Sequence, residues 1–355
     1  MVPLNVAAAL LPVVVFLVIL LLMDSFKLVP FRAIVGALCA GAAAALGALG
    51  LEAWILSTGH VSGWVLPRYV SPVVEETLKA LYVVVVLRRR RLGFLVDAAL
   101  VGFAVGTGFA LVENPFYLRR YHDARLLLSL MRGFGPAILH GTLTACFAMI
   151  AKTLTDRHPE RWAVMSLSGL GAVIALHSIF NHFALPPILA TAVLLIALPA
   201  VMTYVFERSE KATREWVGDG LDLDLDLLNL ITSPAFQHTR FGKYLKELRA
   251  HFDGACVSDM FCLLRLELEL SIRAKGMLMA REAGLGLPSD PALKDKLEEL
   301  KYLQASIGPT GMLALKPLRV ASDRDHWHAY LLEQAGMEPR AQAWFRQVRR
   351  RFGVS

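Results

Sequence analysis

Ionisable side chains stand inside long apolar stretches of this sequence, and they occur in short groups with helical spacing. Glu75 and Glu76 are followed by Lys79, so on a helix one lysine lies three or four residues from either carboxylate and can neutralise it. Charged groups are costly inside a membrane, so each one requires a pairing partner or a function. Carboxylates held in such a place can exchange protons with water during a reaction.

Three further groups of polar residues follow, each in a separate apolar stretch. Glu113 and Asn114 stand directly before a proline, and His140 is alone in the next stretch. His177 and Asn181 are four residues apart, which puts them on one face of a helix. Taken singly, each group has a structural explanation, either as a helix end before proline or as a hydrogen-bonded packing residue.

Their depth along the helices argues that these groups belong together. Counted from the nearest basic residues on one side, at about 1.5 Å per helical residue, Glu75 and His140 lie about 18–20 Å away and His177 about 24 Å. Asn181 and Glu113 lie farther, at about 30–33 Å on the same scale. In a hydrocarbon core about 30 Å thick, all of them fall in one half or at its edge. We therefore expect four helices to contribute to one buried polar site.

The side chains of this site can activate a water molecule. A buried glutamate can act as a general base, a histidine can share its proton, and Asn181 can donate to a developing oxyanion. A set of glutamates and histidines also suits zinc, although no HExxH sequence is present. The residues that could ligate zinc are Glu76, Glu113, His140 and His177. The sequence leaves a glutamate-dependent and a zinc-dependent mechanism open.

The elements that must position these residues are membrane-spanning helices. The chain has 355 residues, of which 55% are hydrophobic and only 19% are charged, and its mean hydropathy is +0.50. This composition is typical of a polytopic membrane protein. About seven spans are predicted, at residues 2–23, 33–56, 72–87, 92–116, 133–154, 162–183 and 186–206. The fold class is therefore all-α, a polytopic helical membrane bundle.

The distribution of charge divides the chain after residue 206. Residues 1–206 contain 15 Lys+Arg and 9 Asp+Glu, whereas the rest contains 22 and 21. The positive excess lies in the membrane half, where it is expected to set topology rather than to bind nucleic acid. The basic cluster at residues 88–91 indicates the cytoplasmic side and places the C-terminal part there as well.

Residues 207–355 are expected to form a cytoplasmic, soluble and mostly helical domain. Helical periodicity occurs at residues 244–252, 260–282 and 291–303. Residues 221–226 alternate leucine with aspartate, which favours a short strand or a linker, and they lack the glycine and glutamate of a calcium loop. The sequence His326-Trp327-His328 suggests a metal site, but alternate residues on a helix face different ways, so packing is favoured. The role of this domain stays open, with a cytoplasmic partner as one possibility.

The combination of motifs resembles the PrsW family of intramembrane proteases, a relative of the CAAX prenyl proteases and of bacteriocin-processing membrane proteases. The matching elements are Glu75-Glu76-x-x-Lys79, Phe109-x-x-x-Glu113-Asn114, His140 in an apolar stretch, and His177-x-x-x-Asn181. Their order and their separate helices match as well, over roughly residues 30–206. The resemblance does not extend to the C-terminal domain.

The resemblance implies an intramembrane endopeptidase that cuts membrane-tethered proteins near the extracytoplasmic face. Glu75 and Glu76 would be the catalytic carboxylates, one of them activating water, and His177 the essential histidine. Asn181, which is Asp in many relatives, would be an oxyanion donor. The site would be completed by Lys79, Glu113, Asn114 and His140. The family has been described both as metal-dependent and, through its relatives, as glutamate-dependent, so the resemblance does not decide whether zinc is the cofactor.

A relative that makes the first cut in an anti-sigma factor suggests a role in envelope signalling and a location in the bacterial inner membrane. The expected partners are the lipid bilayer and a membrane-tethered substrate. The alternative is a non-catalytic membrane protein, either a proton-coupled carrier or a scaffold, because buried carboxylates and histidines also form proton relays. Transporters often contain paired repeats, and no internal repeat is visible in this sequence.

Overall fold

The computed structural model describes residues 2–24, 28–89, 92–120, 126–157, 161–182, 186–285, 292–318 and 332. Within these ranges every regular element is a helix, and no strand occurs. The chain divides into two compact units, Met1–Ala212 and Thr213–Ser355. The His326-Trp327-His328 sequence lies outside the described residues. The described part of the chain thus has the all-α character that the sequence predicts.

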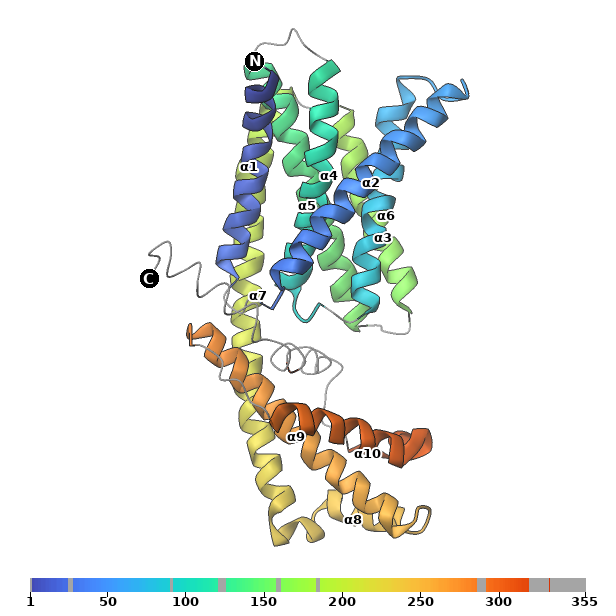
Figure 1. Ribbon diagram of the computed structural model, residues 1–355, viewed down its shortest axis with the longest axis vertical. Coiled ribbons are helices and arrows are strands. Elements are labelled where there is room, and N and C mark those ends of the chain that lie inside the picture. Colours follow the sequence, from blue (N-terminus) through green and yellow to red (C-terminus); the bar gives the residue numbers. More distant parts are fainter. Residues whose placement is uncertain are drawn as a thin grey trace. The chain divides into compact units, whose positions relative to one another are not determined.

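In the described residues of the first unit, seven helices coincide with the predicted apolar stretches (Figure 1). They are α1 (Val2–Met23), α2 (Phe31–Ser57), α3 (Ser71–Arg88), α4 (Leu95–Arg120), α5 (Leu126–Arg157), α6 (Trp162–Asn181) and the first part of α7 (Pro187–Thr232). A π-helical turn, η1 (Leu66–Val70), directly precedes α3. Among the described residues, three segments are long and apolar enough to cross a membrane, namely Phe31–Ser57, Leu95–Phe116 and Gly135–Asp156. Leu10–Met23 and Ser166–Asn181 are shorter apolar helices.

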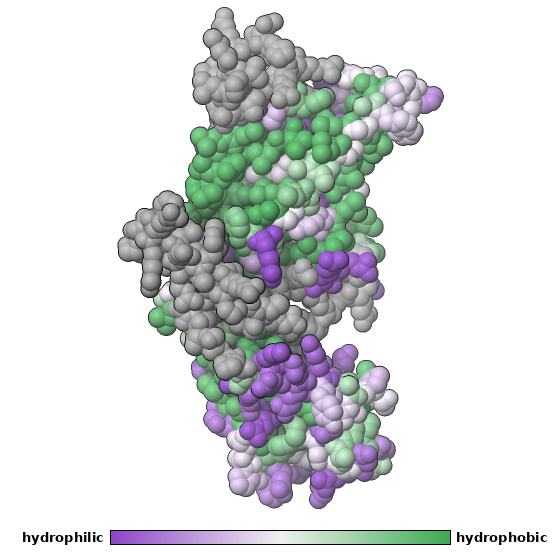
Figure 2. All heavy atoms as spheres, in the orientation of Figure 1, coloured by the Kyte–Doolittle hydropathy of each residue, from purple (hydrophilic) through white to green (hydrophobic). Residues whose placement is uncertain are grey.

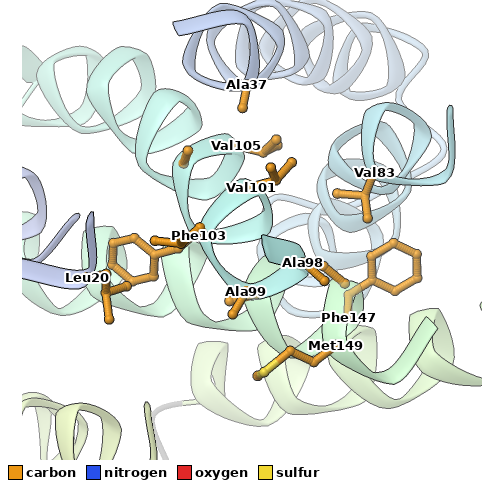
Figure 3. Close-up of a cluster of buried hydrophobic side chains, with 14 of the residues drawn as sticks. Leu20, Ala37, Val83, Ala98, Ala99, Val101, Phe103, Val105, Phe147 and Met149 are labelled. Carbon is orange, nitrogen blue, oxygen red and sulfur yellow. The ribbon is translucent and has the colours of Figure 1, made fainter. Parts of the chain in front are cut away.

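Helix α4 is the centre of this unit, because it packs against α1, α2 and α5. Its side chains fill a core to which the neighbouring helices add Leu20, Ala37, Val83 and Phe147 (Figure 3). Phe103 of α4 is fully buried in this core. The visible outer surface of the unit is mostly hydrophobic (Figure 2), as expected for helices that lie against lipid.

Glycines let the backbones of α4 and its neighbours approach closely. Gly102 and Gly106 form a GxxxG sequence on the face of α4 that contacts α5. A Cβ atom on Gly102 would lie 2.5 Å from the Thr144 carbonyl, and one on Gly106 would overlap the His140 carbonyl. The absence of side chains at these two positions therefore brings His140 directly beside α4.

Helix α4 continues through Pro115 to Arg120, so the helix stop considered for this proline does not occur. Prolines are tolerated inside membrane helices because neighbouring groups can satisfy the backbone carbonyl that the proline leaves unpaired. The consequence is that Glu113 and Asn114 lie within the helix, and their side chains are buried, at 9% and 4% exposure.

The second unit contains the end of α7, η3 (Pro234–His238), α8 (Arg240–Leu248), α9 (Gly254–Glu282) and α10 (Ala292–Leu315). Side-chain caps begin two of these helices: Thr239 accepts a hydrogen bond from Gly242 N, and Asp253 from Cys256 N. Helix α9 supplies much of the core of this unit, including Met260. In α10 the left-handed φ of 70° at Gly308 produces a kink.

The prediction of a strand or linker at residues 221–226 is wrong, because this segment is part of α7. Its Asp224 side chain is buried and accepts hydrogen bonds from Lys275 Nζ at 2.7 Å and Ser271 Oγ at 2.5 Å, both on α9. On a helix Asp224 can face α9 while Asp222 and Asp226 stay exposed, whereas on a strand all three aspartates would share one face. The ion pair with Lys275 therefore agrees with a helix at these residues and not with the strand that the two-residue period of the sequence suggested.

Candidate active site

Four helices of the first unit bring six ionisable side chains into one cluster. The members are Glu75, Glu76 and Lys79 from α3, Glu113 from α4, His140 from α5 and His177 from α6. None of them is more than 9% exposed. All six were expected from the sequence, and the structure places them in mutual contact inside an apolar bundle.

Lys79 is fully buried at the middle of the cluster. Its Nζ donates to Glu76 Oε1 at 2.6 Å, lies 3.0 Å from His140 Nδ1, and stands 4.5 Å from the ring centroid of Phe109. An ammonium group has donors only, so His140 Nδ1 accepts and its Nε2 carries the proton. Lys79 therefore neutralises Glu76 and fixes the tautomer of His140.

Each histidine is in contact with a glutamate that lies on a different helix. His177 Nδ1 donates to Glu76 Oε1 at 2.8 Å, and Nε2 of this ring lies 4.0 Å from Glu75 Oε2. His140 Nε2 lies 2.6 Å from Glu113 Oε2, although the angle is not that of a well-directed hydrogen bond. Such carboxylate–histidine pairs are typical of metal centres, where the carboxylate orients the ring.

Glu75 occupies the space between the two histidines and has a free oxygen atom. Its Oε2 is 3.9 Å from His140 Nδ1 and 4.0 Å from His177 Nε2, and it has no hydrogen-bond partner among the described residues. A buried carboxylate oxygen without a donor requires a cation, a water molecule or a substrate group. Glu75 is therefore the member of the cluster that is available for chemistry.

The cluster fits a divalent metal ion of the zinc type. Glu75, His140 and His177 offer ligand atoms that all lie within 4.8 Å of one another. One carboxylate with two histidines is a donor set of catalytic zinc sites, in which a fourth position holds water. Three carboxyl side chains also stand against one ammonium group, and a divalent ion would balance their excess negative charge when all three are ionised.

The group that could hold a metal ion only partly overlaps the set that the sequence suggested. Glu76 and Glu113, named there as possible ligands, lie against the histidines, whereas Glu75 belongs with His140 and His177 to the group whose atoms could hold the ion. The side-chain amide of Asn181 donates to the Pro67 carbonyl at 2.7 Å, so this hydrogen bond ties it to the backbone of η1. Asn114 is buried beside Glu113 on α4.

Glu52 is a further acid near the cluster that sequence reasoning missed. It lies on α2, is 6% exposed, and interacts with Ser71, Glu75 and Glu113. Its Oε1 has no hydrogen-bond partner within the described part of the chain. The signal was a lone acid in the apolar stretch 33–56, which is the same criterion that identified the other residues.

The fold and the site together define a membrane-embedded helical protein with a buried Glu/His centre able to activate water. The family model of the PrsW family intramembrane metalloproteases matches residues 24–206, a range that includes every member of the cluster. The chain belongs to this family, which confirms the resemblance seen in the sequence, and it is accordingly an intramembrane peptide hydrolase. No curated protein and no solved structure matches the chain.

Proposed function

We propose that the chain is an endopeptidase that hydrolyses membrane-tethered proteins at the Glu75–His140–His177 cluster, near the extracytoplasmic face. The observation that carries the proposal is the free Oε2 of Glu75, which faces two histidines. The adjacent Glu76 is committed to His177 and Lys79, whereas Glu75 has a free oxygen. A carrier would not need this division of roles between adjacent carboxylates.

The mechanism assigns a separate task to each side chain. Glu75, His140 and His177 would hold a metal ion of the zinc type, which when bound lowers the pKa of a coordinated water and polarises the scissile carbonyl. Glu76 holds the ring of His177 so that Nε2 faces Glu75.

The other two charged side chains, Glu113 and Lys79, take part in proton transfer and in charge compensation. We assign Glu113 Oε2, which like Glu75 Oε2 lacks a well-directed hydrogen bond, as the acceptor of the proton that water releases. Lys79 donates to Glu76 and thereby orients its carboxylate. The apolar bundle around the cluster excludes bulk water, which strengthens each of these interactions.

The side of the membrane on which cleavage takes place follows from charge and helix length. Helix α3 ends at Arg88, and Glu75 lies 13 residues before it, hence about 20 Å away along the axis. With the basic residues 88–91 on the cytoplasmic side, the cluster lies in the outer half of the membrane. We propose the same topology for the rest of the chain: about seven spans in residues 1–206 and a cytoplasmic domain in residues 207–355. Envelope signalling in a bacterial inner membrane, such as anti-sigma factor processing, is a role consistent with this topology.

The test is a comparison of membrane proteomes from cells that express wild type, Glu75→Gln or Glu298→Gln at matched levels. Glu298 is a surface glutamate of the second unit, with a side chain 67% exposed, and serves as the control. We expect a single-span protein to lose its extracytoplasmic part with wild type and with Glu298→Gln, but not with Glu75→Gln. Cleavage that persists with Glu75→Gln would contradict the assignment. Identical proteomes together with proton-coupled uptake by reconstituted protein would favour a carrier.

A further inference from the structure

The C-terminal end of α6 is tied to the π-helical turn η1 by two side-chain hydrogen bonds. Ser178 Oγ donates to the Arg68 carbonyl at 2.6 Å, and Asn181 Nδ2 donates to the Pro67 carbonyl at 2.7 Å. The two donors are three residues apart on α6, and the two acceptors are consecutive. Beside them, the rings of Tyr69 and His182 meet edge to face with centroids 4.9 Å apart.

The sequence of η1 explains why these carbonyls need donors from another helix. In this turn Ser71 N bonds to Leu66 O, which is the spacing of a π-helix. The next bond of that type would run from residue 72 to Pro67 O, and an α-helical bond to Arg68 O would use the same N–H. Residue 72 is a proline and has no N–H, so neither bond can form. In a membrane, a backbone carbonyl without a donor is costly, and α6 supplies the two missing donors.

The position of these bonds connects them to the cluster. Ser178 directly follows His177, and η1 directly precedes the helix that carries Glu75 and Glu76. We propose that Ser178 and Asn181 are positioning residues whose bonds to η1, the α6–η1 latch, set the distance between the two glutamates and His177. The proposal rests on the function proposed above. It assigns Asn181 to the backbone of η1 rather than to an oxyanion.

The experiment compares wild type, the double variant Ser178→Ala/Asn181→Ala and the control Ser166→Ala as full-length proteins in micelles. Ser166 is a buried serine of the same helix, about three turns from the latch. Binding of Co²⁺, measured by competition with a chelator, reports the geometry of the cluster, and hydrogen exchange of residues 64–76 reports the hold on η1 and the first turn of α3. We expect the double variant to bind Co²⁺ about tenfold more weakly or worse and to exchange faster, because residues that orient metal ligands have effects of this size. Ser166→Ala should match wild type in both measurements.

A second substitution tests the reason for the latch. Pro72→Ala restores an N–H that can bond to the carbonyls of η1, so the double variant should lose less Co²⁺ affinity in this background than in the wild-type background. Faster exchange with unchanged Co²⁺ affinity would reduce the latch to a structural contact and overturn the proposal. If the wild-type protein binds no Co²⁺, the metal assignment of the proposed function fails. The latch is then tested by hydrogen exchange alone, and unchanged protection of residues 71–76 in the double variant would overturn it.

Discussion

His177 and Glu76 meet across α6 and α3, with Nδ1 of the histidine 2.8 Å from Oε1 of the glutamate. The carboxylate can only accept, so this bond fixes the proton on Nδ1 and leaves Nε2 facing Glu75. Two adjacent glutamates thereby acquire different roles. Glu76 is committed to His177 and Lys79, whereas Glu75 keeps a free oxygen in the same cluster.

This difference predicts that Glu75→Gln and Glu76→Gln both lose cleavage activity, but for different reasons. Glu75→Gln removes a charge but no hydrogen bond at Oε2, so we expect cleavage and Co²⁺ binding to fall by about a hundredfold or more with an unchanged unfolding temperature. Glu76→Gln leaves the buried Lys79 without its counter-ion, which costs about 3–5 kcal/mol. Its unfolding temperature should therefore fall together with its activity.

Thermal unfolding in micelles and Co²⁺ titration distinguish the two variants. Glu298→Gln, an exposed substitution of the same chemical kind, controls for the loss of a carboxylate as such. A Glu75→Gln protein as unstable as Glu76→Gln would show that Glu75 has a structural partner, and the assignment of its free oxygen would then be wrong.

Lys79→Met should make the stability of the protein depend on a metal ion. The substitution keeps an apolar stem of similar length but removes the only ammonium in the cluster, so three carboxylates lose their compensating charge. It also removes the ammonium group that lies 3.0 Å from His140 Nδ1, so this nitrogen would bind the metal ion without competition from Lys79. We expect a lower unfolding temperature without metal and a larger rise on addition of Zn²⁺ than in wild type.

The measurement is the Zn²⁺-dependent shift of the unfolding temperature, with Lys294→Met as a control, since Lys294 has a side chain 78% exposed. Equal shifts in wild type and Lys79→Met would mean that the lysine neither competes with a metal nor replaces its charge.

The helices and the membership of the cluster could be predicted because charged residues in apolar stretches are rare and lie at similar depths. The roles of its members could not, because they depend on how each helix is rotated. Depth does not tell whether Glu75 or Glu76 points at His177. The same limit applies to Asn181, whose partner is a backbone carbonyl that only Pro72 makes available. At residues 221–226 the alternation of leucine and aspartate was misleading, because the segment is helical and its Asp224 pairs with Lys275 of another helix.

The buried pair of Lys275 and Asp224 predicts a stability effect in the second unit. Lys275→Met leaves Asp224 as an uncompensated buried charge, which costs about 3–5 kcal/mol, whereas Lys275→Met with Asp224→Leu should recover most of the loss. At about 1.4 kcal/mol per factor of ten, the single variant should be cleaved by added protease at least a hundredfold faster within residues 213–318. The double variant should resemble wild type, and a double variant as sensitive as the single one would contradict the ion-pair explanation.

The contact between α4 and α5 predicts that one methyl group is enough to disturb the cluster. In Gly106→Ala the new Cβ would overlap the backbone carbonyl of His140, and backbone cannot move aside as a flexible side chain can. Helix α5 must shift at the residue that carries His140, so we expect Co²⁺ affinity to fall by about tenfold or more and the unfolding temperature to decrease.

Gly171→Ala is the matched control, since a Cβ on this α6 residue would meet nothing within 4 Å. Alanine is favoured over glycine in a helix by about 1 kcal/mol, so this variant should be as stable as wild type or more stable, with full Co²⁺ affinity. Calorimetry gives the unfolding temperatures of the two variants, and metal titration gives their Co²⁺ affinities. If Gly106→Ala behaves like Gly171→Ala, the close approach of α4 and α5 does not position His140, and the geometry of the site must be set by the contacts of α3 and α6 instead.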